Sequence, residues 1–136
     1  MAARKIRIGY KRFPGAEQGT CFYCGMPADT VDHVPPVSLV DSLVGLERLL
    51  PRWVVPACHE CNSTLGDEPL FKLSERAAFL IEKYEKLYHN YLSCGDFSDD
   101  ELSELGPILR SQVENAVAVK RVITRRLQSL MCLADE

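Results

Sequence analysis

The chain has no apolar segment that approaches the length of a membrane span. Charged and strongly polar side chains interrupt every hydrophobic run of its 136 residues well before the roughly 20 that a transmembrane helix needs. The opening residues, Met-Ala-Ala-Arg-Lys, are not followed by the apolar core of a secretory signal peptide. We therefore expect a cytoplasmic protein that does not enter a membrane.

Internal repeats and low-complexity tracts are also missing, which argues against solenoid and fibrous architectures. Hydrophobic residues make up 46% of the chain and charged residues 26%, the balance of an ordinary globular protein. At this length we expect one domain, with room for an appended helical lobe.

An excess of positive charge is lacking as well, since the formal net charge is −3. The charges are unevenly spread: residues 1–59 hold seven basic and five acidic side chains, whereas residues 60–104 hold four and eleven. Two basic clusters could contact phosphates, or could simply be solvated surface. The first is an N-terminal arm of Arg4, Lys5, Arg7, Lys11 and Arg12, and the second consists of Lys120, Arg121, Arg125 and Arg126.

Four of the six cysteines form two Cys-x-x-Cys pairs. Cys21 and Cys24 make the first pair, and Cys58 and Cys61 the second. Disulfides are the alternative, but paired spacing without a signal peptide favours one tetrahedral structural zinc ion, Zn²⁺. Zinc would join the two ends of the intervening segment. The remaining two thiols, Cys94 and Cys132, are expected to be buried.

Three further polar residues lie close to these pairs in the sequence. Asp32 and His33 follow the first pair, and Asn62 directly follows the second. Carboxylate and carboxamide oxygens suit a hard cation such as Mg²⁺ or Mn²⁺, and a neutral imidazole can accept a proton from water near neutral pH. These residue types suit phosphodiester hydrolysis, although Asp32 and His33 could form a surface turn and Asn62 could cap a helix.

Hydrophobic patterns predict short strands near the cysteines and helices in the second half of the chain. The expected extended segments are residues 4–13, 30–34 and 52–56. The expected helical segments are a turn within 39–50, a short helix over 58–65, a helix from Ser74 to Gly95, a capping-box helix over 98–105 and a long helix from Pro107 to Met131. The last helix carries a wide apolar stripe that should pack on the Tyr84–Tyr91 face of the helix that begins at Ser74.

Residues 21–67 resemble zinc-containing HNH endonucleases, which belong to the ββα-metal, or His-Me finger, nucleases. The segments that carry the resemblance are Cys-Phe-Tyr-Cys, Asp-His-Val-Pro-Pro and Cys-His-Glu-Cys-Asn. It implies an α+β fold, in which a small zinc-stapled ββα-metal core is followed by a mainly helical C-terminal extension. It also implies that His33 is the general base and that Asp32 and Asn62 hold a catalytic Mg²⁺ or Mn²⁺.

The chain departs from the family pattern in two places. The family's central Asn is absent from residues 52–55, so we expect His33 to be oriented by another group, such as a backbone carbonyl. Leu65 stands where many members have lysine. Arg52 could contact phosphate beside the basic arm.

The resulting hypothesis is an endonuclease or nickase whose substrate is nucleic acid, with DNA expected. It divides the chain into an arm (1–20), a core (21–72) and a helical lobe (73–136). One alternative is a non-catalytic zinc-knuckle module that binds nucleic acid or protein. Another is an interaction protein that forms a homodimer through its C-terminal helices.

Overall fold

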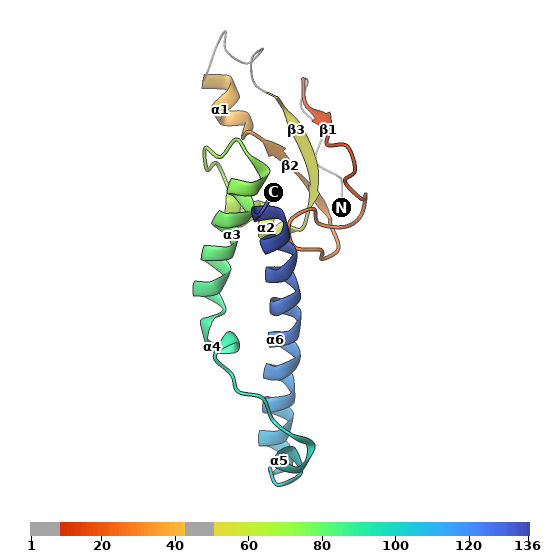
Figure 1. Ribbon diagram of the computed structural model, residues 1–136, viewed down its shortest axis with the longest axis vertical. Coiled ribbons are helices and arrows are strands. Elements are labelled where there is room, and N and C mark those ends of the chain that lie inside the picture. Colours follow the sequence, from red (N-terminus) through yellow and green to blue (C-terminus); the bar gives the residue numbers. More distant parts are fainter. Residues whose placement is uncertain (1–8, 43–50) are drawn as a thin grey trace.

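The computed structural model describes residues 9–42 and 51–136 and has an α+β architecture. Figure 1 shows an elongated molecule with the sheet at one end and the helix α6 extending away from it. The strands are β1 (Lys11–Arg12), β2 (Thr30–Val34) and β3 (Trp53–Ala57). The helices are α1 (Val37–Ser42), α2 (His59–Leu65), α3 (Leu73–Leu87), α4 (His89–Leu92), α5 (Asp99–Ser103) and α6 (Pro107–Ala134).

The sheet has the order β1-β3-β2. β2 and β3 are antiparallel, with Asp32 opposite Val55 and His33 opposite Val54. β1 is parallel to β3, and its Lys11 lies opposite Trp53. Two residues of the expected basic arm are therefore a strand of the sheet.

The two faces of the sheet belong to different hydrophobic clusters. Val55 joins the main core, which also contains the cysteines of both pairs, Leu80 of α3 and Leu130 of α6. Val54 packs on the other side in a small cluster with Tyr10 and Val40. Successive residues of a strand project to opposite faces of the sheet. On the paired strand β2, Asp32 therefore faces the side of Val55, and His33 faces the side of Val54.

Helix α2 begins directly after β3 and ends after two turns. Cys58 is its N-cap and accepts a hydrogen bond from the Cys61 backbone N–H. Gly66 ends the helix with a φ of 49°, a backbone conformation that glycine adopts at little cost. The short helix expected over 58–65 is confirmed.

Most of the other expected elements are present, with different boundaries. The helix expected from Ser74 to Gly95 instead begins at Leu73 and ends at Leu87, and α4 follows as a separate turn. The Ser98 capping box and the proline in the first turn of α6 are confirmed. The turn expected within 39–50 is helical over Val37–Ser42, and residues 43–50 lie outside the described part of the chain.

Helix α6 packs against α3 mainly through its C-terminal half (Figure 1). Ile123, Leu127, Leu130 and Leu133 are buried there. At the opposite end Ile108 is 79% exposed, so the prediction that the apolar stripe would be buried along its length was wrong at this end. Over residues 9–42 and 51–136, none of the helices combines the length and hydrophobicity that crossing a membrane requires.

Candidate metal centre and its surroundings

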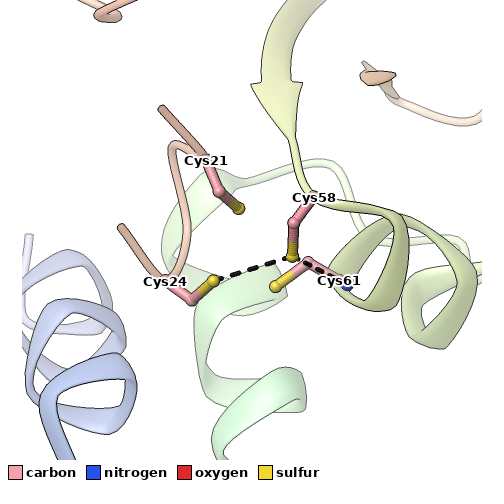
Figure 2. A group of neighbouring side chains, drawn as sticks. All are labelled: Cys21, Cys24, Cys58 and Cys61. Carbon is pink, nitrogen blue, oxygen red and sulfur yellow. Dashed lines mark hydrogen bonds between the residues drawn. The ribbon is translucent and has the colours of Figure 1, made fainter. Parts of the chain in front are cut away.

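The four paired cysteines converge between the sheet and the helices. Figure 2 shows Cys21 and Cys24 on a loop, Cys58 at the end of β3 and Cys61 in α2, with their side chains pointing toward one another. The loop turns tightly because Gly25 has a φ of 79° and its N–H donates to the Cys21 carbonyl. The Phe22 N–H donates to the Pro56 carbonyl and fixes the loop against β3.

The spacing of the sulfur atoms fits a tetrahedral zinc ion. All four Sγ atoms lie within 4.8 Å of one another, and those of Cys24 and Cys58 are 3.7 Å apart. Zinc–sulfur bonds of about 2.3 Å in a tetrahedron place the sulfurs about 3.8 Å apart. All four are free thiols, and none of them is exposed. The cluster could therefore hold one structural zinc ion, as the sequence predicts.

Helices α3 and α6 bring a hydroxyl and a guanidinium to this cluster. The Tyr84 hydroxyl of α3 donates to Cys61 Sγ at 3.1 Å. Burial and the neighbouring Cys61 sulfur raise the pKa of Tyr84 above its ordinary value, so the hydroxyl keeps its proton. Arg126 of α6 stacks over the Tyr84 ring at 4.7 Å and pairs with Glu60 at 2.6 Å. Burial opposes its charge, but Cys24 and Glu60 outweigh this effect and raise the pKa of Arg126.

These contacts suit four thiolates around zinc, whose net charge would be negative. A hydrogen-bond donor and a cation beside the sulfurs offset part of that charge. The two helices are therefore linked to the metal centre by polar contacts as well as by the shared hydrophobic core.

Asp32 is buried on the α3 side of β2 and has two partners. Arg76 donates to both carboxylate oxygens, from Nη2 at 2.9 Å to Oδ1 and at 2.7 Å to Oδ2. The Tyr23 hydroxyl donates to Oδ2 at 2.5 Å. Arg76 is fully buried and also donates to the Leu70 carbonyl.

Both oxygens of Asp32 are thus already engaged by Arg76. Burial opposes the charge on Arg76, but Tyr23 and Asp32 outweigh this effect and raise the pKa of the guanidinium. In this arrangement the Asp32 carboxylate does not fit a divalent cation, because the Arg76 guanidinium already bonds both of its oxygens. Within the described ranges, no second group of three or more His, Cys, Asp or Glu side chains is placed to hold a metal.

His33 projects from the opposite face of β2. It is 8% exposed, and its ring meets that of Tyr10 edge to face, with the centroids 4.8 Å apart. The Tyr10 hydroxyl donates to the Pro35 carbonyl at 2.6 Å, which fixes the Tyr10 ring beside His33. An aromatic side chain thus lies directly against the histidine.

Asn62 connects α2 to β2. Its Nδ2 donates to Thr30 Oγ1 at 3.2 Å and to the Val31 carbonyl at 3.1 Å. The carboxamide therefore lies beside the residue that precedes Asp32. Sequence reasoning also allowed Asn62 to be a helix cap, but the N-cap of α2 is Cys58.

The expected phosphate-binding residues have different surroundings. Lys11 and Arg12 are exposed on β1, whereas Arg4, Lys5 and Arg7 lie outside the described residues. The Arg52 guanidinium lies against Gly9, where a Cβ atom would come within 2.5 Å of it. In the second basic cluster, on α6, Arg121 and Arg125 are exposed. Lys120 donates to the Cys94 carbonyl, and Arg126 is buried.

Sequence reasoning missed the polar residues that complete the buried contacts, namely Tyr10, Tyr23, Arg76, Tyr84 and Arg126 in these roles. A signal was present for the two arginines. Arg76 precedes the buried Leu80 by four residues, and Arg126 precedes the buried Leu130 by four, so each stands in an apolar stripe. A buried arginine requires an anionic partner. The expectation that Cys94 and Cys132 are buried was wrong, because Cys94 is partly buried and Cys132 is exposed.

Comparison of the chain with protein-family models, curated proteins and solved structures finds no match in any of the three.

Proposed function

We propose that the protein is an HNH-type endonuclease that hydrolyses phosphodiester bonds of nucleic acid, with DNA as the expected substrate. The observation that carries the proposal is the order β2-β3-α2 around the four cysteines, with Asp32 and His33 on β2 and Asn62 on α2. Asn62 is hydrogen-bonded to β2 immediately before Asp32. This connectivity is the one that the HNH resemblance implies for the segment, whereas Asp32 and His33 project from opposite faces of β2.

In this proposal His33 is the general base. Its imidazole accepts a proton from water, whose oxygen attacks phosphorus while the bond to the 3′ oxygen breaks. The products are a 5′-phosphate and a 3′-hydroxyl, as the resemblance implies. Tyr10 positions the imidazole in place of the family's Asn, because its ring contacts His33 and its hydroxyl is fixed to Pro35.

The resemblance implies that a catalytic Mg²⁺ or Mn²⁺ would be held by Asp32 and Asn62 and would supply positive charge near the phosphate. This assignment carries a condition, because Asp32 must first give up Arg76 as its partner. Catalysis therefore requires a divalent cation at a concentration that competes with the buried guanidinium. The dependence of the rate on Mg²⁺ concentration measures this competition.

A second function is favoured by the same ion pair. If Asp32 and Arg76 stay together, the ββα unit is a zinc-stapled module that binds nucleic acid or a protein without cleaving it. The buried pair then serves only to tie α3 to β2.

Cleavage of supercoiled plasmid by zinc-loaded protein, with and without added Mg²⁺ or Mn²⁺, distinguishes the two functions. We expect cleavage by the parent and a loss of about 10²–10⁴-fold in His33→Ala, the typical contribution of a positioned base. His59→Ala is the matched control, because His59 is exposed on α2 and its ring contacts the Ser63 hydroxyl. Equal rates for parent and His33→Ala would point to a contaminating nuclease, and no cleavage by either would favour the binding module.

A further inference from the structure

A groove lined by aromatic side chains lies beside the sheet, and the residues that line it do not include the four paired cysteines, Asp32, His33 or Asn62. It has a volume of about 340 Å³, within the range of ligand-binding clefts. Four aromatic residues from separate parts of the chain contribute to it: Phe13, Phe22, Trp53 and Phe71. Lys72 and Glu136 also line the groove.

The aromatic rings support one another and remain partly accessible. Phe13 meets Trp53 edge to face at 5.3 Å between centroids, and it meets Phe22 at 5.4 Å. Those three side chains are half-buried, whereas Phe71 is 41% exposed. Soluble proteins usually bury rings of this size, so a cluster that stays open to solvent suits a planar ligand.

Positive charge accompanies the groove on two sides. Lys72 is exposed in the lining, next to Phe71 in the sequence. Lys11 and Arg12 are exposed on β1, where Lys11 is the register partner of Trp53. Glu136 is acidic, but a carboxylate can accept a hydrogen bond from the amino group of a base.

We infer that this groove binds an unpaired base of single-stranded nucleic acid, with the adjoining phosphates held by Lys72 and Lys11. Aromatic rings interleaved with cations are the usual means of holding single strands, because every base has a face that can stack. A base inside a duplex is already stacked and cannot enter. The inference rests on the proposed function and specifies its substrate as nucleic acid with an unpaired base, either a single strand or a locally unpaired segment of a supercoiled duplex.

Trp53 is the chain's one tryptophan, so its fluorescence reports directly on the groove. The test titrates zinc-loaded protein, without added Mg²⁺, with a short oligothymidylate, an abasic strand of equal length and a duplex. We expect the oligothymidylate to quench Trp53, and the abasic strand and the duplex to do so only weakly. Equal quenching by the abasic strand or by the duplex would overturn the inference.

Two exposed phenylalanines provide a matched pair of variants. Phe71→Ala should weaken oligothymidylate binding by about tenfold, since stacking on one ring contributes on the order of 1–3 kcal/mol. Phe97→Ala removes a ring that is 39% exposed and lies outside the groove, so it should leave the affinity unchanged. Equal affinities of the two variants would contradict a stacking role for Phe71.

The binding measurement is independent of cleavage. Binding without Mg²⁺-dependent cleavage would refute the nuclease and keep the groove as a single-strand site. Cleavage with no effect of Phe71→Ala on binding would refute the groove and keep the nuclease. Quenching by an apolar peptide but not by the oligonucleotide would assign the groove to a protein partner and overturn the inference.

Discussion

At the scale of single residues, the contact between Asp32 and Arg76 is the feature that bears most on function. The HNH resemblance makes Asp32 a ligand of a catalytic cation, whereas in the structure its two oxygens accept hydrogen bonds from a buried guanidinium. Both roles need the carboxylate to be charged. Only the pairing with Arg76 makes the stability of the fold depend on that charge.

Asp32→Asn should destabilise the protein by about 3–5 kcal/mol, because it leaves Arg76 charged and buried without an anionic partner. Asp29→Asn is the control, since Asp29 is exposed three residues earlier and should change stability by less than about 0.5 kcal/mol. Urea unfolding of the zinc-loaded variants measures both values. A similar small change in the two variants would show that Arg76 does not depend on Asp32.

The residues of the metal centre could be read from the sequence, whereas their polar partners could not. The Cys-x-x-Cys spacing predicts that the two sulfurs of each pair lie close together, and in the structure all four sulfurs converge. Arg76 and Asp32 are 44 residues apart, and Tyr84 and Cys61 are 23 apart. No local pattern links such positions, because the contacts depend on how α3 packs on β2 and α2.

At the scale of secondary structure, the types of the elements were predictable and some of their ends were not. Ser98 predicted the start of α5, and Gly66 predicted the end of α2, because each is a residue type that caps helices at that end. Helix α3 instead begins after Lys72, which caps no backbone N–H with its side chain. Its start was misplaced at Ser74 because no side-chain cap marks the residue at which the helix begins.

The packing of α6 is uneven, and this gives a prediction for the element. Leu130 is fully buried against α3, whereas Ile108 at the other end is 79% exposed. Leu130→Ala should cost about 2–5 kcal/mol through lost burial and the cavity left behind. Ile108→Ala should change the free energy of unfolding by less than about 0.5 kcal/mol. Comparable losses in denaturant unfolding would mean that the distal half of α6 is covered in solution, as in the homodimer hypothesis.

At the scale of the whole molecule, the four cysteines connect the parts of the fold. They belong to the same core as β3, α3 and α6, and Tyr84 and Arg126 reach the cluster from the two long helices. Structural zinc contributes folding free energy directly, on the order of 10 kcal/mol or more in small domains. The sheet and the helices α3 and α6 should therefore lose stability together when zinc is removed.

Removal of zinc with a chelator should abolish the cooperative thermal transition seen by circular dichroism. Cys58→Ser should have the same effect, because three thiolates hold zinc less tightly than four. Cys132→Ser is the control, since Cys132 is exposed and lies outside the cluster. An unchanged melting temperature after complete zinc removal would contradict a structural role for the metal.

The most direct test of the proposed function is the chemistry of the ends that the protein leaves in DNA. Supercoiled plasmid is incubated with zinc-loaded protein and Mg²⁺, and the nicked product is treated with DNA ligase. The proposed function requires nicks that ligase seals without prior end repair, because water attack with loss of the 3′ oxygen leaves a 5′-phosphate and a 3′-hydroxyl. Failure to form Mg²⁺-dependent nicks, or nicks that ligase cannot seal, would contradict it.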